Sequence, residues 1–319
     1  MTAMQGYVPP SRRPGELGVH SLDHFALTVP DLELARRFYN AFGLHMPEEG
    51  GKLGIYVPGQ PHRWGILSEG PRKQHGFISF GVFEDDFAGF RKRLQDLGVK
   101  QLDPPAGNET NGLWFRDPDG NLIELAVARK SSPDAKSQVS ISSVPGGVRG
   151  APGRSAAPNV SPRRFAHMLL FTTDVPRSIE FYGQVLGMRL SDRSADIIAF
   201  MHGIHGSDHH MLAFAKSSAP GHHHTSWDVG TVNDIGLGAL QMLNAGHEKG
   251  WGLGRHVLGS NYFHYVRDPW GSYCEYSCDI DYVPHDCDWD GGDHSGPDSF
   301  YIWGPNVPED FVHNYEGDR

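Results

Sequence analysis

Histidine and carboxylate side chains at repeated positions are the residues of this chain best suited to chemistry. The chain has 19 histidines in 319 residues, and three stand together in GHHHTSWDVG as His222, His223 and His224. Successive side chains of a strand point to opposite faces, so His222 and His224 are expected on one face and His223 on the other. This alternation leaves two candidates for a metal ligand.

An internal repeat distinguishes between these two candidates. The segment HGFISFGVFED at 75–85 aligns with HTSWDVGTVND at 224–234. In this alignment His75 matches His224, and a duplicated position is a better candidate for a shared role than an unduplicated one. The repeat therefore selects His224 as the ligand.

The same duplication supplies two further positions. His24 begins HFALTVPDLELARRFYNAFG and His167 begins HMLLFTTDVPRSIEFYGQVLG. RDPDGNLIE ends at Glu124, and RDPWGSYCE ends at Glu275. The second half of the chain thus carries His167, His224 and Glu275 near the ends of three predicted strands.

Two histidines and one carboxylate form the facial triad of non-haem iron(II) sites, which leaves coordination positions open for a substrate and dioxygen. Imidazole and carboxylate ligands suit iron(II) but do not separate it from manganese(II). Iron(II) is therefore the expected cofactor, with manganese(II) as the alternative. The first half keeps His24, His75 and Glu124, so a metal there is a second, open possibility.

Each half must position these side chains with the same series of elements. An apolar strand follows the first histidine, and an aspartate then begins a helix that Gly43 or Gly187 ends. Further strands follow, and a second strand–helix unit closes with a hairpin whose turn is Asp-Pro-Xaa-Gly. The expected fold is α+β, with tandem βαβββ modules, two per domain, that form curved sheets with helices outside.

Composition along the chain predicts the domain boundaries. The segment 131–162 is rich in Ser, Pro and Gly, has few large apolar residues, and is predicted to be a linker. It separates a first domain at 19–130 from a catalytic domain at 163–283, and an N-terminal tail covers 1–18. The C-terminal tail, 284–319, ends in aromatic residues that are expected to pack on its own domain or on a neighbouring subunit of a homo-oligomer.

Overall composition excludes several classes of function. The net charge of −10 argues against nucleic acid and anionic membranes as partners. No apolar run approaches the roughly 20 residues that span a bilayer, and the N-terminus lacks the apolar segment of a secretory signal. Three cysteines give no disulfide framework and favour a cytoplasmic setting. The three cysteines are Cys274, Cys278 and Cys287. They lack the paired spacing of zinc ligands, so a zinc site formed with His285 is the weaker interpretation.

The sequence resembles the two-domain type I extradiol ring-cleavage (catechol) dioxygenases of the vicinal-oxygen-chelate superfamily. That superfamily also contains glyoxalases and bleomycin-resistance proteins. The resemblance covers about 20–130 and 163–283. GRHVLGSNYFHYVRDPWGSYCEY resembles the family's signature through its third metal ligand, HTSWDV the segment around the second, and FAHMLLFTTDVPRSIEFYGQVLG the segment around the first. The resemblance implies the same three metal ligands, His167, His224 and Glu275.

The resemblance also implies residues that act on the substrate. The family's catalytic histidine falls on His210 within DHHMLAFA, with His209 as its less favoured neighbour. The substrate-side histidine and tyrosine of the family fall on His256 and Tyr265. A histidine suits the proton transfers of ring cleavage, and the other two would hydrogen-bond the substrate oxygens. The alternative for His210 is a residue that orients a metal ligand.

The function implied by the resemblance is that of an Fe(II)-dependent extradiol dioxygenase. It would cleave a catechol-type aromatic with O₂ in the degradation of aromatic compounds. Two alternatives keep the fold: a glyoxalase-like metal-dependent isomerase or lyase, and a non-catalytic small-molecule binding protein. In the first half Arg63 replaces His210 and Trp114 replaces Tyr265, so that half is expected to be a vestigial copy.

Overall fold

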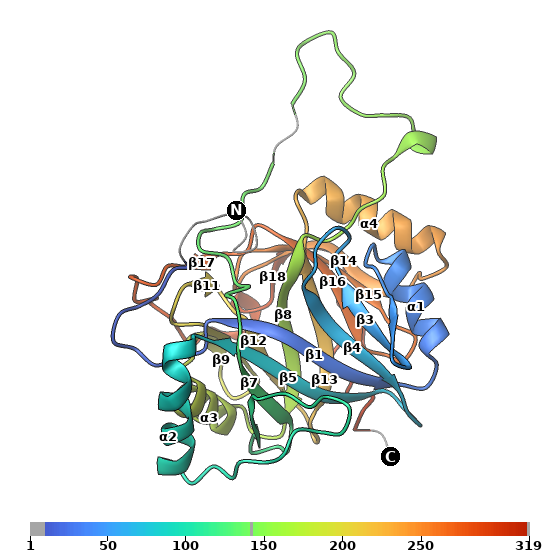
Figure 1. The fold of residues 1–319 in the computed structure, drawn as a ribbon. Helices are drawn as coiled ribbons and strands as arrows, with labels where there is room; N and C mark the ends of the chain where they lie inside the picture. Colours follow the sequence, from blue (N-terminus) through green and yellow to red (C-terminus); the bar gives the residue numbers. More distant parts are fainter. Residues whose placement is uncertain (1–9, 141–142, 318–319) are drawn as a thin grey trace.

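Two curved sheets with helices on their outer faces make up the body of the protein in a computed structural model, which describes residues 10–140 and 143–317 (Figure 1). The first half forms a seven-stranded sheet in the order β2-β3-β4-β1-β5-β7-β6. Its elements are β1 (Ser21–Val29), α1 (Leu32–Ala41), β2 (Glu48–Glu49), β3 (Lys52–Tyr56), β4 (Arg63–Glu69), β5 (Gln74–Val82), α2 (Phe87–Asp96), β6 (Leu113–Arg116) and β7 (Leu122–Val127).

The second half forms a nine-stranded sheet in the order β18-β14-β15-β16-β13-β8-β12-β10-β9. Its elements are β8 (Arg164–Thr172), α3 (Val175–Leu186), β9 (Arg189–Ser194), β10 (Ile198–His202), β12 (Leu212–Lys216), β13 (Gly221–Asp228), α4 (Val232–Asn244), β14 (Gly250–His256), β15 (Tyr262–Arg267), β16 (Tyr273–Cys278) and β18 (Tyr301–Trp303). A two-stranded ribbon joins β11 (Ser207–Asp208) to β17 (Tyr282–Val283).

The duplication predicted from the sequence is visible in the strand order. From its β9 edge, the second sheet runs β9-β10-β12-β8-β13-β16-β15, which corresponds strand for strand to β2-β3-β4-β1-β5-β7-β6 of the first sheet. The second sheet then adds β14 and β18. The predicted α+β class is confirmed. One strand differs, because the second module of the first half has only an isolated bridge between Leu102 and Trp114 where the second half has β14.

Side chains that cap the helices explain where they begin. The Asp31 carboxylate accepts a bond from the Leu34 N–H, and Asp174 accepts one from the Arg177 N–H, as an N-cap residue should. Gly187 ends α3 at φ 70°, a left-handed conformation that glycine adopts at no steric cost. The buried faces of these helices pack on the sheets.

The two halves share one hydrophobic core and are not independent bodies. In Figure 1, α1 lies beside α4 and α2 lies beside α3. Between the halves, Phe42 stacks on Tyr276 with ring centroids 3.8 Å apart, and the Tyr276 hydroxyl donates to the Phe42 carbonyl at 2.8 Å. One cluster of buried apolar residues runs through both sheets.

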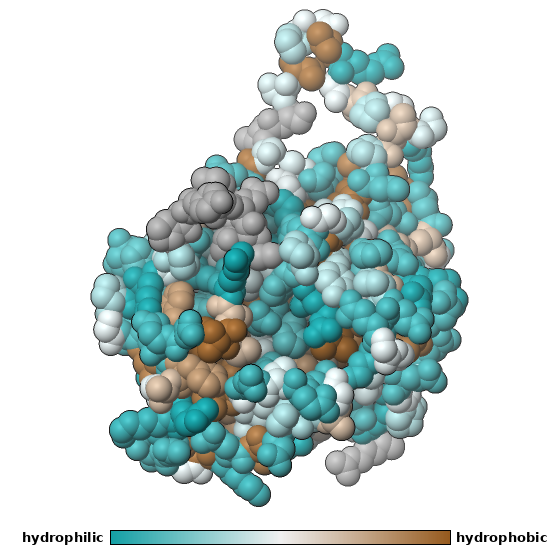
Figure 2. Space-filling view, in the orientation of Figure 1, coloured by the Kyte–Doolittle hydropathy of each residue, from teal (hydrophilic) through white to brown (hydrophobic). Residues whose placement is uncertain are grey.

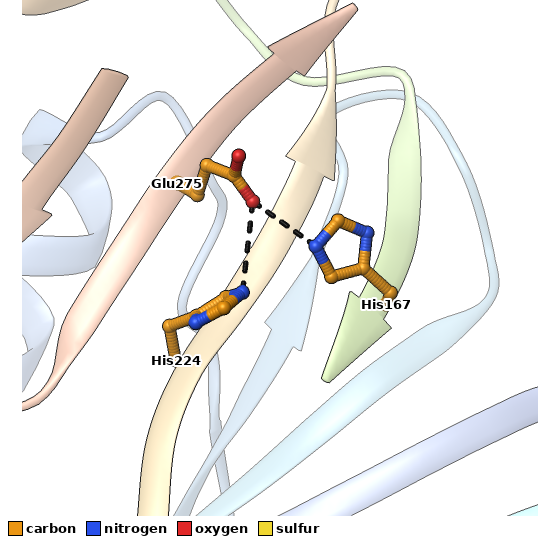
Figure 3. Close-up of side chains that lie close together, drawn as sticks. All are labelled: His167, His224 and Glu275. Carbon is orange, nitrogen blue, oxygen red and sulfur yellow. Dashed lines mark ion pairs between the residues drawn. The ribbon is translucent and has the colours of Figure 1, made fainter. Parts of the chain in front are cut away.

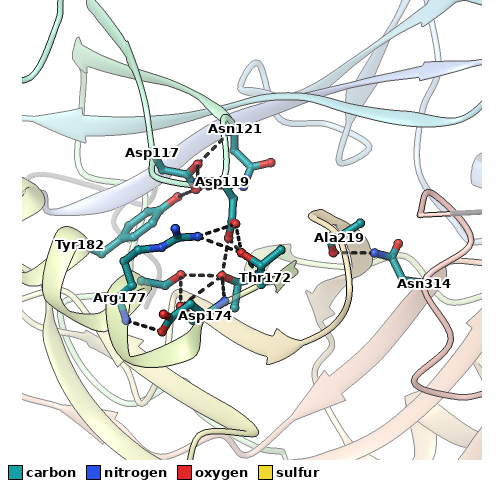
Figure 4. Close-up of polar contacts among 11 residues, drawn as sticks. Asp117, Asp119, Asn121, Thr172, Asp174, Arg177, Tyr182, Ala219 and Asn314 are labelled. Atoms are coloured by element: carbon teal, nitrogen blue, oxygen red, sulfur yellow. Dashed lines mark hydrogen bonds and ion pairs between the residues drawn. The ribbon is translucent and has the colours of Figure 1, made fainter.

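The Asp-Pro-Xaa-Gly turn of the first half also docks on the second half (Figure 4). Asp119 accepts bonds from the Thr173 hydroxyl and the Arg177 guanidinium at the start of α3, at 2.5 and 2.8 Å. The Tyr182 hydroxyl donates to Asp117 at 3.0 Å. The negative charge of the turn therefore lies at the positive end of a helix, where it is stabilised.

The segments outside the sheets differ in how closely they pack. Within the predicted linker, Ser131, Ser132, Ser137 and Val160 are buried against the body, so the part that projects from the molecule is its middle, around 143–156 (Figure 1). Figure 2 shows apolar side chains on this projection, where Val144 and Val148 are exposed. Of the N-terminal tail predicted at 1–18, residues 1–9 lie outside the described chain. No described helix is long and apolar enough to cross a membrane.

The C-terminal tail packs on the second sheet. Strand β18 pairs with β14, opposing Tyr301 to His256, and Phe311 is buried among the aromatic side chains of that sheet. Ile302 and Trp303 are 62% and 44% exposed on the edge strand. The tail thus covers one end of the second sheet and leaves an apolar edge in solvent.

A buried lysine ties the two halves to the C-terminal tail. Lys73, just before β5, bonds to the His222 Nδ1 at 2.8 Å and to the Ser272 hydroxyl. It also pairs with Glu316 at 3.4 Å and with Asp268 at 3.9 Å. One ammonium group therefore compensates two carboxylates that are themselves almost fully buried.

We expect Lys73→Met to lower the free energy of unfolding by about 3–5 kcal/mol, because it leaves buried carboxylates without a cation. Urea titration followed by circular dichroism measures the change. Lys92→Met is the matched control, since Lys92 is 74% exposed and its pair with Asp96 is worth less than about 1 kcal/mol. Equal stability of the two variants would contradict the role given to Lys73.

Buried neutral histidines should make stability fall with acidification. Burial lowers the pKa of His20 to about 3 and that of His202 to about 4. Below the unfolded pKa of about 6.5, only the unfolded state takes up these protons, so each histidine lowers stability by up to about 1.4 kcal/mol per pH unit as pH falls toward 4. Urea titrations at pH 7.5, 6 and 5 should show the loss, and His202→Asn should reduce its slope. A flat profile would contradict this assignment.

Candidate metal centre

Three neighbouring strands bring His167, His224 and Glu275 together. They come from β8, β13 and β16, which lie side by side in the second sheet (Figure 3). Glu275 Oε2 lies 3.1 Å from His167 Nε2 and 3.7 Å from His224 Nε2. One ligand atom from each residue lies within 4.8 Å of the others, and all three residues are buried. No other such group of His, Cys, Asp or Glu occurs in the described part of the chain.

Two of the three atoms that converge have no hydrogen-bond partner in the protein. Glu275 Oε2 and His224 Nε2 are buried and make no hydrogen bond. Buried polar atoms are almost always satisfied, so atoms that face one another unpaired are suited to a shared metal ion. Two imidazoles and one carboxylate match the donor set of non-haem iron and manganese sites.

Hydrogen bonds behind His224 fix the nitrogen that faces the centre. His223 Nε2 lies 2.7 Å from the Phe311 carbonyl, to which it must donate, so its Nδ1 is an acceptor. His224 Nδ1 lies 2.7 Å from that atom and therefore carries the proton. The His224 Nε2 lone pair is left free, as a metal ligand requires.

A β-bulge reverses the strand alternation expected for the histidine run. The pairing of β13 with β8 shifts between His222 and His224, so His223 is an extra residue in the strand. His223 consequently lines the same cavity as His224, whereas His222 turns away to Lys73. The expectation that His222 shares the face of His224 and that His223 points away is wrong.

The register of the first sheet also corrects the repeat. Ala26 of β1 and Leu169 of β8 are equivalent, because each lies two residues after the first histidine of its half. Ala26 pairs with Phe77 of β5, and Leu169 pairs with His224 of β13. Phe77, and not His75, is therefore the counterpart of His224. The alignment was two residues out of register, although it selected a residue that the structure does place at the centre.

The first half consequently lacks a second histidine at the equivalent place. His24 Nε2 is 4.0 Å from Glu124 Oε2, but the Phe77 ring fills the third position, 5.4 Å from the His24 ring. Glu124 is already bonded by Ser79 at 2.6 Å and by the Thr110 hydroxyl. His24, His75 and Glu124 therefore do not form a triad.

His210 reaches the centre, whereas His209 lies behind it. The His210 ring is 4.1 Å from that of His167 and borders the cavity. His209 is fully buried and bonds to His210 on one side and to Asp192 on the other. Burial holds the pKa of His210 well below its usual value, so that its neutral form is favoured.

His256 and Tyr265 lie on the opposite wall. Their side chains are joined by a bond of 2.9 Å between His256 Nε2 and the Tyr265 hydroxyl, and the second nitrogen of His256 donates to the Phe300 carbonyl at 2.8 Å. Burial raises the pKa of Tyr265 and lowers that of His256. Both are thus neutral groups that can exchange hydrogen bonds with a ligand.

Asn261 and His223 are site residues that the sequence did not single out. The Asn261 amide donates to Glu275 Oε1 at 3.2 Å, which leaves Oε2 for the centre. Burial alone would raise the pKa of Glu275, but contact with His167 holds it below its usual value. Asn261 lies inside the segment GRHVLGSNYFHY, so its closeness to His256 in the sequence was the signal that could have identified it as a site residue.

The centre lies at the base of an apolar cavity. None of the residues lining it is Asp, Glu, Lys or Arg. Apolar side chains of the sheet and of the tail form most of its walls: Leu169, Ile198, Phe200, Leu258, Phe300, Phe311 and Val312.

The cysteines do not form an alternative metal site. Cys274 and Cys278 are buried on β16, on the side of the sheet that faces the hydrophobic core, and Cys287 is exposed. All three are free thiols.

Comparisons with known proteins agree with the duplication. The model of the Glyoxalase/Bleomycin resistance protein/Dioxygenase superfamily matches residues 21–125 and 164–276. A curated relative, Metapyrocatechase 2 of Cupriavidus necator, is 52% identical over 98% of both chains. The family resemblance inferred from the sequence is thereby confirmed.

Two solved structures share the fold. A Mn(II)-bound glyoxalase from Novosphingobium aromaticivorans superposes with a TM-score of 0.74 at 24% identity, covering 91% of this chain and 93% of the other. An extradiol ring-cleaving dioxygenase from B. fuscum gives a TM-score of 0.74 at 21% identity, covering 96% and 84%. One fold thus carries two chemistries, and the side chains of the site must separate them.

Proposed function

This chain belongs to the Glyoxalase/Bleomycin resistance protein/Dioxygenase superfamily, and we propose that it is an extradiol dioxygenase that opens a catechol-type ring with both atoms of O₂. The observation that carries the proposal is the triad of His167, His224 and Glu275 at the base of an apolar cavity. His210 and Tyr265 face the same space.

Iron(II) is the proposed metal, with manganese(II) as the alternative, because the ligand set accepts both. His167 Nε2, His224 Nε2 and Glu275 Oε2 would hold it. When bound, the metal would bring the catechol oxygens and dioxygen together and carry electron density between them.

The chain's own side chains would handle the protons. His210 would accept a proton from a catechol hydroxyl and return it later in the reaction, which a neutral imidazole at the cavity wall can do. His256 and Tyr265 would hydrogen-bond the substrate oxygens and stabilise developing negative charge. The apolar walls would exclude water and stack on the ring.

A glyoxalase-like isomerase or lyase is the second candidate, because a manganese glyoxalase shares the fold. The two differ in their need for oxygen. Turnover of catechols that stops under argon supports the dioxygenase, whereas turnover without oxygen supports the isomerase or lyase.

The cavity predicts selection against charged rings. A carboxylate on the substrate would enter a space lined by no lysine or arginine, and burying an unpaired charge costs several kcal/mol. We expect iron(II)-loaded protein to turn over 4-methylcatechol with a kcat/KM at least about 100-fold above that for 3,4-dihydroxybenzoate, which has a carboxylate in place of the methyl group.

Oxygen uptake and the absorbance of ring-opened products measure this ratio together. The protein is loaded anaerobically with Fe(II) and then assayed in air. A ratio near one would contradict the account of the cavity, and absence of oxygen uptake with every catechol would contradict the proposed function.

Two features support further parts of the proposal. The three free thiols fit a cytoplasmic protein. Ile302 and Trp303 on the edge strand β18 offer an apolar surface to a second copy of the chain. We therefore favour a cytoplasmic homo-oligomer. The first half is proposed to be a scaffold without its own metal.

A further inference from the structure

A second pair of adjacent histidines leads away from the cavity to a buried carboxylate. His209 Nδ1 lies 3.0 Å from His210 Nδ1, and His209 Nε2 lies 2.8 Å from Asp192 Oδ2. All three residues are buried, but only His210 borders the cavity. Asp192 therefore cannot touch a substrate, and any effect on the reaction must pass through His209.

The donors and acceptors in the hydrogen-bonded series His210–His209–Asp192 determine which ring nitrogens carry protons. A carboxylate only accepts hydrogen bonds, so His209 Nε2 carries a proton toward Asp192. With that one proton on its ring, His209 presents an unprotonated Nδ1, to which His210 Nδ1 donates. This leaves the Nε2 of His210 without a proton, which is the form that can accept one from a substrate hydroxyl.

We propose that Asp192 and His209 are positioning residues that hold His210 in the tautomer protonated on Nδ1, so that its Nε2 enters the reaction as a base. The inference rests on the proposed ring cleavage for its consequence in catalysis. The tautomer itself is a property of the protein and can be measured without turnover.

The surroundings of Asp192 keep it an acceptor. The Gly292 N–H donates to it at 2.9 Å, the His294 ring lies at 2.6 Å and the Trp289 N–H lies at 3.3 Å. Burial would raise the pKa of the carboxyl, but the bonds from His209, Gly292 and His294 lower it to about 2. Asp192 therefore stays ionised near neutral pH.

The two histidines are also fixed in place. The His209 N–H donates to the Asp281 carbonyl at 2.7 Å. Gly259, at φ 86°, packs so closely that a Cβ there would lie 3.2 Å from His210 and 3.4 Å from the His209 ring. The rings have little room to turn, so the hydrogen-bond chain decides which nitrogen of His210 carries the proton.

Asp192→Asn tests the proposal because it should reverse the direction of the hydrogen bond between residue 192 and His209 Nε2. The amide oxygen is expected to stay on the side of the Gly292 N–H, because that bond, at 2.9 Å, is shorter than the bond of the Trp289 N–H to the oxygen that faces His209, at 3.3 Å. The amide NH₂ then faces His209 Nε2. His209 is then protonated on Nδ1 and donates to His210, whose proton moves to Nε2. Asp293→Asn is the matched control, since Asp293 is half exposed and pairs with Arg193 at the surface.

The first readout is the ¹⁵N spectrum of histidine-labelled protein loaded with diamagnetic Zn(II), with the His210 signals identified by their loss in His210→Asn. Wild type and Asp293→Asn should show an unprotonated Nε2 on His210, and Asp192→Asn should show an unprotonated Nδ1. An unchanged His210 tautomer in Asp192→Asn would overturn the proposal, whatever the activity.

The second readout is the kinetics of the iron-loaded enzyme. Asp192→Asn should keep its iron and lower kcat at least about tenfold with KM changed less than about threefold, and Asp192→Glu should recover much of the loss. A kcat equal to that of wild type would overturn the proposal. If Asp192→Asn does not fold, His209→Phe replaces it, since a phenyl ring cannot accept the proton of His210; full kcat there would overturn it equally.

Discussion

His167→Ala is expected to abolish iron binding and to lower the ring-cleavage rate at least about 1,000-fold. The variant removes one of three ligands, and the remaining histidine and carboxylate face a space that water would fill. Removing a residue that hydrogen-bonds a metal ligand already lowers metal affinity roughly 10–100-fold, so removing the ligand itself should lower it further. Iron content after anaerobic loading and oxygen uptake with 4-methylcatechol measure the two effects.

The duplication supplies the control for this experiment. His24 occupies the same place on β1 as His167 on β8, since His24 pairs with Ser79 as His167 pairs with Ser226. His24→Ala should leave about one iron per chain and full activity, because Phe77 stands where a second histidine would be needed. Iron retained in His167→Ala, or lost in His24→Ala, would move the metal to the other half.

The sequence was sufficient to predict the fold because its signals are local and occur twice. Capping aspartates, glycine stops and Asp-Pro-Xaa-Gly turns recur in both halves, so each half confirmed the interpretation of the other. The structure brings together His167, His224 and Glu275, the residues that sequence motifs had named. His167 and Glu275 each adjoin a run of residues that matches its repeat partner, whereas His224 does not.

Strand register was the part that local signals could not determine. A bulge at His223 depends on which residues of β8 the strand pairs with, and a shift of one residue exchanges the two faces. For the same reason the sequence alignment matched His75 to His224, although Phe77 is the residue at the equivalent place. Gaps in a repeat are invisible when the aligned segments share few residues, as HGFISFGV and HTSWDVGT do.

Contacts from distant segments were also beyond the reach of the sequence. The Phe311 carbonyl fixes the His223–His224 pair from 88 residues away, and Asp192 holds His209 from strand β9. Neither partner has a motif of its own. Their roles follow only from the pairing of hydrogen-bond donors with acceptors in the folded chain.

His210→Asn is expected to keep the metal and lose most of the rate. His210 touches the His167 ring but offers no atom to the triad, so iron content should stay near that of wild type. Removing a general acid–base residue lowers kcat by roughly 10²–10⁴-fold. KM for 4-methylcatechol should change little, because the apolar walls that hold the ring are unaltered.

The repeat again provides a matched control, and imidazole provides a test of the role. Arg63 is the counterpart of His210 in the first half, since Gly65 pairs with Phe25 as Leu212 pairs with Met168, so Arg63→Gln should retain full kcat. In His210→Ala, added imidazole should restore part of kcat if the lost group moves protons, whereas a residue that only orients a ligand would not be replaced in this way. Full activity of His210→Asn would transfer the proton-transfer role to His209.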